Sequence, residues 1–151
     1  MIPSEHRTAL ATQCLWSLQE AVIEIEGLLL THIEGLTWTT TLRGDDSTER
    51  LAAVSTAMFL LGDETNELWG HGESQEVLLK LSTQDRDKNP DNDDTIRHVL
   101  MRPIGEDAIL VMVCRVDHLT DRFYTLMSLA QQYLEDMLLG NDPPLPIWYD
   151  D

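Results

Sequence analysis

One acidic segment of the sequence has the side-chain spacing of a calcium-binding loop. Its oxygen-bearing side chains recur at every second position: Asp85, Asp87, Asn89, Asp91 and Asp93. Such a loop also needs glycine at its sixth position, for a sharp turn, and a bidentate glutamate at its twelfth. Pro90 and Ile96 occupy those positions here. We therefore predict a solvated hairpin loop over residues 83–94 and no calcium site.

The histidines and cysteines form no pattern that indicates a metal site or a catalytic nucleophile. A zinc site needs three or four ligands brought together, and no CxxC or His-x3-His pair supports His71 and Glu73. His32 lies in an apolar run, where a single histidine is typical of a hydrogen-bonded core residue. Cys14 and Cys114 have apolar neighbours, which raise the pKa of a thiol and suppress its reactivity. We expect no catalytic residue, no metal, no cofactor and no enzymatic activity.

The charge balance excludes several classes of partner. The chain has 10 Lys and Arg against 27 Asp and Glu, a net charge of −17. Nucleic acids and anionic lipids are bound by clustered basic residues, and the only lysines are Lys80 and Lys88. The longest apolar run, 108–114, is much shorter than the roughly 20 residues that span a bilayer. We expect protein partners, no nucleic acid, no membrane insertion and a cytoplasmic location.

Hydrophobic periodicity predicts the elements that must position these residues. Apolar spacings of three and four indicate helices over about residues 5–22, from Asp46 to about residue 69, and from Asp117 to about residue 139. Asp46 and Glu49 have the spacing of a capping box, and Asp117 can cap the last helix. Strands are predicted over 28–33, 36–42, 77–82, 95–102 and 108–114.

These elements indicate an α+β sandwich. The first and fifth strands are apolar on both faces and should lie centrally, whereas the second alternates with threonine and should lie near an edge. We predict an antiparallel sheet in the order 2-1-5-4-3, with helices 1 and 3 on one face and helix 2 on the other. Residues 1–140 are predicted to form one domain.

Residues 141–151 are predicted to form a stiff C-terminal tail, because it contains Pro143, Pro144 and Pro146. Trp148 and Tyr149 follow these prolines. The tail could present a PxxP motif to an aromatic groove, fold back over an apolar patch, or stay loose.

The second helix carries two apolar stripes. One contains mainly large side chains: Leu51, Val54, Met58, Leu61 and Leu68. The other contains mostly small ones: Ala52, Ala53, Thr56, Ala57 and Leu60. Two stripes need two partners, so we expect the sheet on one side and a further helix on the other. That second partner is either another part of this chain or a second copy of it.

Four segments, taken in order, resemble the Roadblock domain family. They are Gly27–Leu30 leading to Glu34–Leu36, Glu49–Ala53, Leu68–Leu81 and Ile104–Val111. The eukaryotic members of this family include dynein light chains, and the bacterial members partner small Ras-like GTPases. The sequence departs from many bacterial members in its acidic loop over 85–94 and in its proline-aromatic tail.

The resemblance implies a cytoplasmic homodimer without an active site. Family members dimerise through the second helix and third strand, which implies an interface at Ala53, Thr56, Ala57, Leu60, Val77, Leu79 and Leu81. The resemblance further implies a non-enzymatic adaptor that binds a small Ras-like GTPase and modulates its nucleotide cycle or localisation. The alternative hypothesis is an acidic dimeric chaperone for a secreted effector protein, which would bind a basic or apolar client segment.

Overall fold

The computed structural model of the chain describes residues 4–84 and 94–148. The acidic loop residues 85–93, which carry the calcium-like spacing, and Tyr149 lie outside the described residues. Three helices and five strands follow in the order α-β-β-α-β-β-β-α. Their bounds are α1 Glu5–Ala21, β1 Ile25–His32, β2 Thr37–Thr40, α2 Asp45–Glu67, β3 Val77–Thr83, β4 Thr95–Ile104, β5 Ala108–Cys114 and α3 Asp121–Leu138.

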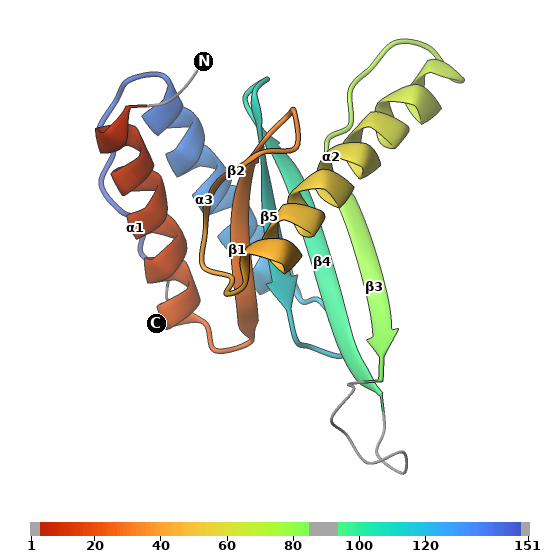
Figure 1. Cartoon of the computed structure of the whole chain (residues 1–151), viewed down its shortest axis with the longest axis horizontal. Helices are drawn as coiled ribbons and strands as arrows, with labels where there is room; N and C mark the ends of the chain where they lie inside the picture. The colour runs from red at the N-terminus through yellow and green to blue at the C-terminus, as the bar shows by residue number, and fades with distance from the viewer. Residues whose placement is uncertain (1–3, 85–93, 149–151) are drawn as a thin grey trace.

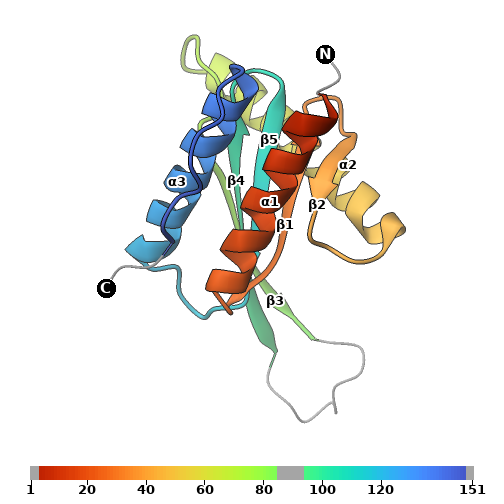
Figure 2. The ribbon, with the colours of Figure 1, turned by 90° about the vertical axis from the view of Figure 1, so that its left-hand side faces the viewer.

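The five strands form one antiparallel sheet in the order β2-β1-β5-β4-β3, as the sequence predicts. Helices α1 and α3 lie side by side on one face and α2 crosses the other (Figures 1 and 2). The short strand β2 and the strand β3 are the two edges. The predicted fold class is therefore confirmed.

The sheet separates two hydrophobic cores of unequal size. Along β1, Leu28 and Leu30 face the larger core, beneath α1 and α3, and Leu29 faces the smaller core, beneath α2. On β5, Met112 and Val111 divide in the same way. Alternate side chains of a strand point to opposite faces, so the parts of β1 and β5 that lie between the two cores are apolar on both faces.

Two predicted helix caps are wrong. α2 begins at Asp45, with Gly44 as its N-cap in a positive-φ conformation, and no side chain caps it. Asp46 therefore lies inside the first turn, where a carboxylate favours the helix dipole but cannot form the predicted capping box. α3 begins at Asp121 after Thr120, so Asp117 is too far upstream to cap it. The expected cap of α1 is confirmed, because the Ser4 hydroxyl accepts the Arg7 amide.

The described part of the C-terminal tail folds back along the helix pair (Figure 2). The Arg7 guanidinium donates to the carbonyls of Gly140 and Asn141 and to the Asp142 carboxylate. Trp148 is buried in the larger core and donates its indole N–H to Ser17 at 3.0 Å. Of the outcomes considered for the tail, folding back over an apolar patch is the one observed for Trp148.

Candidate interaction surface

The buried residues of α2 are small or hydroxylated, apart from one phenylalanine. The buried residues of this helix are Thr48, Ala52, Ser55, Thr56 and Phe59. The Ser55 hydroxyl donates to the Leu51 carbonyl at 2.7 Å, and the Thr56 hydroxyl donates to the Ala52 carbonyl at 3.1 Å. These bonds within the helix satisfy both hydroxyls, so they are buried without the cost of an unpaired polar atom.

The opposite side of α2 exposes apolar side chains to solvent. Its members are Ala53, Val54, Ala57, Leu60 and Leu61. No charged residue occurs anywhere between positions 51 and 62. We call these five residues the outward face of α2. The large-residue stripe thus divides: Leu51 and Met58 pack on the smaller core, while Val54, Leu61 and Leu68 are exposed.

The predicted interface residues lie in three environments. Ala53, Ala57 and Leu60 belong to the outward face of α2, whereas Thr56 is buried against the sheet. On β3, Val77 and Leu79 are half-buried against the smaller core, and Leu81 is exposed. Of the exposed members, Ala53, Ala57 and Leu60 lie on α2, and Leu81 lies on the edge strand β3.

Strand β3 pairs only with β4 in the described sheet, in a register that runs from Val77 opposite Met101 to Thr83 opposite Thr95. Its other edge therefore presents backbone N–H and C=O groups with no neighbouring strand in that sheet (Figure 1). Such an edge is able to pair with a strand of another chain.

The loop from α2 to β3 is tied to the helix by Ser74. The Ser74 amide donates to the Asp63 carboxylate at 2.6 Å, and its hydroxyl donates to the Phe59 carbonyl at 3.0 Å. A Cβ atom at position 62 would lie 2.2 Å from the Ser74 hydroxyl oxygen. The close approach of the loop to α2 therefore depends on glycine at this position. The loop and the helix line an open groove of about 560 Å³. The apolar residues of its lining include Met58, Leu61 and Val77. Sequence reasoning missed this groove, because hydrophobic periodicity carries no signal for a loop folding back.

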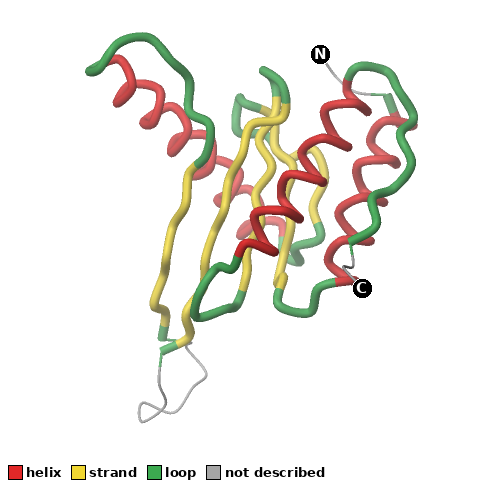
Figure 3. Tube along the Cα trace, turned by 180° about the vertical axis from the view of Figure 1, so that it is seen from behind, coloured by secondary structure: helices red, strands yellow, loops and turns green. Residues whose placement is uncertain are grey.

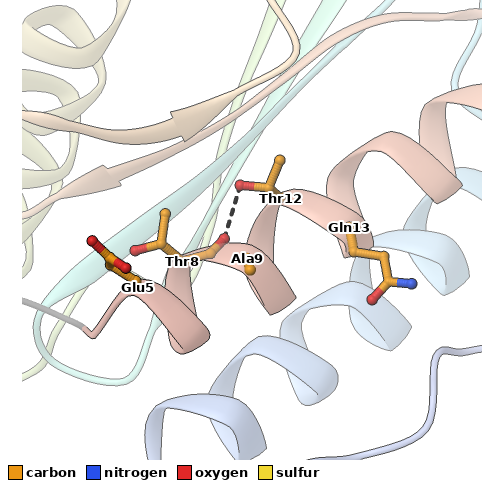
Figure 4. Close-up of a pocket in the computed structure, with 5 residues that line it drawn as sticks. All are labelled: Glu5, Thr8, Ala9, Thr12 and Gln13. Carbon is orange, nitrogen blue, oxygen red and sulfur yellow. Dashed lines mark hydrogen bonds between the residues drawn. The ribbon is translucent and has the colours of Figure 1, made fainter.

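A second open pocket lies on the outer surface of α1, and its hydroxyl groups are engaged in hydrogen bonds (Figure 4). It is lined by Glu5, Thr8, Ala9, Thr12 and Gln13. The Thr12 hydroxyl bonds to the Thr8 carbonyl and to Thr39, and the Thr8 hydroxyl accepts the Trp38 indole N–H. These bonds stabilise the contact between α1 and β2.

The environments of Cys14 and Cys114 agree with the predicted low reactivity of their thiols. Burial raises the pKa of the Cys14 thiol to about 12. Burial, followed by the charges of Glu24 and Glu26, raises the pKa of Cys114 to about 12. A buried, protonated thiol is a poor nucleophile.

The described residues contain no group of three or more His, Cys, Asp or Glu side chains that could hold a metal ion together. His71 and Glu73 therefore belong to no such group. His32 is half-buried and stacks on the Trp38 ring at a centroid distance of 5.5 Å, so it packs as part of β1. Among the described helices, none has the length and apolar composition needed to cross a bilayer.

No family model and no curated protein matches the sequence. The structure, in contrast, matches solved structures over nearly their whole length. A Roadblock/LC7 domain from Streptomyces avermitilis superposes with a TM-score of 0.70 at 15% identity, covering 85% of this chain and 97% of the other. The chain has the Roadblock/LC7 fold. MglB from Myxococcus xanthus gives a TM-score of 0.74 at 11% identity, covering 93% of this chain and 96% of the other.

A third neighbour of this fold is the gliding protein MglB from Thermus thermophilus. It superposes with a TM-score of 0.72 at 14% identity, covering 93% of this chain and 97% of the other. The resemblance that the sequence motifs indicate is thus confirmed at the level of the Roadblock/LC7 fold.

Proposed function

We propose that this chain is a non-enzymatic homodimeric regulator that binds a small Ras-like GTPase and modulates its nucleotide cycle or localisation. The observation that carries the proposal is the uncharged outward face of α2 beside the unpaired edge of β3, on a Roadblock/LC7 fold. In the family that the sequence resembles, these two elements form the dimer, and the dimer is a platform for the GTPase. The catalytic chemistry then belongs to the GTPase.

The negative charge of the chain limits self-association to a surface that has few carboxylates. Each copy carries −17, so two copies carry 2 × −17 = −34 and repel one another. A stable contact must therefore bury apolar surface and avoid juxtaposed carboxylates. The outward face of α2 meets this requirement, because its three central turns have no charge.

The order of residues along α2 also favours an antiparallel pairing. With Ala57 at the twofold axis, Val54 faces the partner's Leu60 and Ala53 faces the partner's Leu61. Arg50 then lies opposite the partner's Glu64, and symmetry gives this ion pair twice. In the single chain Arg50 pairs with Asp46 at 3.6 Å, where both side chains are exposed to solvent. The small Ala57 side chains permit the close approach of about 8 Å that tightly packed helices need.

The dimer is tested by measuring molar mass in solution with light scattering. We expect the mass of two chains for the native sequence and of one chain for Ala57→Glu, because the variant places two carboxylates at the twofold axis. Ala9→Glu is the matched control, since Ala9 is an exposed alanine on α1. A dimeric Ala57→Glu variant would place the interface elsewhere.

The register of the helix pair is tested by exchanging the charges of Arg50 and Glu64. Each single variant, Arg50→Glu and Glu64→Arg, brings like charges together and should raise the dimer dissociation constant about tenfold for the two symmetric contacts. The double variant restores opposite charges and should restore the dissociation constant. Equal weakening in the single and double variants would exclude this register.

The partner is tested by titrating the dimer with small Ras-like GTPases loaded with GTP or with GDP, and by measuring nucleotide turnover in the complex. We expect binding that depends on the nucleotide. A failure to bind any of them in either state would reject the GTPase assignment, and binding of a basic, extended client segment instead would support the chaperone alternative.

A further inference from the structure

The end of α2 and the following loop project past the end of the edge strand β3 (Figures 1 and 3). Two large apolar side chains in this region are largely exposed: Leu68 at 77% and Trp69 at 82%. A tryptophan supplies a large contact area at a small cost in conformational entropy, and it is enriched among residues that dominate binding energy. An adjacent exposed pair of this kind is typical of a docking site.

The groove beside these residues extends the apolar surface inward. Leu61 belongs both to the outward face of α2 and to the lining of the groove of about 560 Å³, where it joins Met58 and Val77. The groove is therefore an open depression, lined in part by apolar side chains, next to two projecting apolar side chains. Its volume is sufficient for one or two side chains of a bound segment.

The charged residues that this segment of the chain contributes to the surface are all acidic. No lysine or arginine occurs between Arg50 and Lys80, and that interval contains Asp63, Glu64, Glu67, Glu73 and Glu76. Asp63 accepts the Ser74 amide, and Glu76 pairs with Arg102 at 2.8 Å. Within the described part of the chain, Glu67 and Glu73 make no ion pair, and both are exposed.

A second copy of the chain neutralises only part of this charge. In the antiparallel pairing centred on Ala57, the partner's Arg50 pairs with Glu64, but Glu67 lies opposite the partner's Ser47 and Leu68 lies opposite the partner's Asp46. The unoccupied acidic and apolar surface therefore favours an occupant that carries the opposite charge.

We propose that the projecting end of α2, formed by Leu68, Trp69, Glu67, Glu73 and the adjacent groove, binds a partner protein through a segment that presents apolar side chains between lysines or arginines. This inference rests on the proposed regulator role and names the surface that holds the partner protein. Each dimer has two such surfaces, one at each end of the helix pair.

The surface is tested on the full chain with three synthetic helical peptides of equal length. One has leucines on one face and lysines on the other, the second replaces the lysines with glutamates, and the third replaces the leucines with serines. Binding is followed by the NMR signal of the Trp69 indole N–H, which is assigned by its loss in Trp69→Phe. We expect the leucine–lysine peptide to shift this signal and the other two to leave it in place.

Matched substitutions locate the peptide on the surface. Trp69→Ala and Leu68→Ser should each weaken binding at least about tenfold, as for residues at the centre of an interface. Leu139→Ser and Ile147→Ala are the controls, because these side chains are 80% and 81% exposed but lie elsewhere. The double variant Glu67→Gln, Glu73→Gln should bind more weakly and lose part of the salt dependence. Equal losses in the control variants, or binding that keeps its full salt dependence in the double variant, would overturn the proposal.

Failure of this surface is distinguishable from failure of the regulator role. A GTPase that binds Trp69→Ala and the native chain equally would refute the surface and leave the role intact. If no GTPase binds but the leucine–lysine peptide still shifts Trp69, the role is refuted and the surface remains. Conversion of Trp69→Ala to a monomer would identify the surface as part of the contact between copies and overturn the proposal.

Discussion

The two faces of the sheet are covered in opposite ways. On one face, α1 and α3 enclose the larger core, and Trp148 of the tail completes it. On the other, a single helix covers the smaller core, and the apolar side chains of its far side remain in solvent. We expect the first arrangement to contribute most of the stability of the chain. The second leaves apolar surface available for binding, which the proposed dimer and partner would use.

Substitution of two adjacent leucines on β1 should give the largest change in stability and so tests this comparison first. Leu30 and Leu29 are both fully buried but face the larger and smaller cores, respectively. Leu30→Ala should lower the free energy of unfolding by about 4 kcal/mol, and Leu29→Ala by about 2.5 kcal/mol. The difference arises because a single helix can relax into a cavity more easily than two helices held together by the tail.

Urea unfolding followed by circular dichroism measures both values, at protein concentrations where the variants have the same oligomeric state. A larger loss for Leu29→Ala would mean that the α2 face contributes more to stability than its smaller core indicates. The comparison between a stabilising face and a binding face would then be wrong.

The next effect concerns the closure of the larger core by Trp148. Trp148→Ala should cost about 2 kcal/mol, which is below the loss for a tryptophan in the middle of a chain, because the end of the tail can detach instead of leaving a cavity. Ser17→Ala removes the hydroxyl that accepts the indole N–H and donates to the Cys14 carbonyl, and it should cost about 1 kcal/mol. Urea unfolding of both variants, with fluorescence of the remaining tryptophans, checks the order. Equal stability of Trp148→Ala and the native chain would show that the tail is not part of the fold in solution.

The order of the strands in the sheet was predictable because the apolar pattern of a strand indicates whether one or both of its faces are buried. β1 and β5 are apolar on both faces and so had to lie centrally, and β2 alternates with threonine and so had to lie near an edge. The helix starts were less predictable. At α2, an aspartate at the N-cap and an aspartate in the first turn differ by only one or two positions in the sequence. The N-cap is Gly44, whose positive φ places Asp45 and Asp46 in the first turn.

The orientation of α2 could not be predicted because two stripes competed for one sheet. Side-chain size favours burying Val54 and Leu61, but the structure buries Ser55 and Thr56 instead. Hydroxyls that bond to their own helix carbonyls are cheap to bury, and small residues let the helix lie close to the sheet. Hydrophobic periodicity gives the angle between stripes but not which stripe faces inward.

The outward face of α2 supplies a smaller effect. Val54 is 49% exposed, so Val54→Ser should change the free energy of unfolding of the monomer by less than about 0.5 kcal/mol. The measurement is urea unfolding in the monomeric Ala57→Glu background, which separates folding from association. The same substitution in the native background should weaken the dimer. A large loss of monomer stability would show that this face supports the fold rather than binding.

The smallest effect is electrostatic and lies where the tail leaves α3. The hydrogen bond from His6, at 3.1 Å, and the charges of Arg7 and His6 lower the pKa of the exposed Asp142 carboxyl below its usual value of 3.8. Because folding lowers this pKa, the carboxylate stabilises the fold above the unfolded value, and the contribution disappears as the pH falls through the folded value. Asp142→Asn should therefore reduce stability slightly at neutral pH and lose its effect in acid. Urea midpoints of the variant and the native chain should converge as the pH falls through the lowered pKa of Asp142. Midpoints that differ equally at both pH values would mean that Asp142 acts through packing of the tail rather than through its charge.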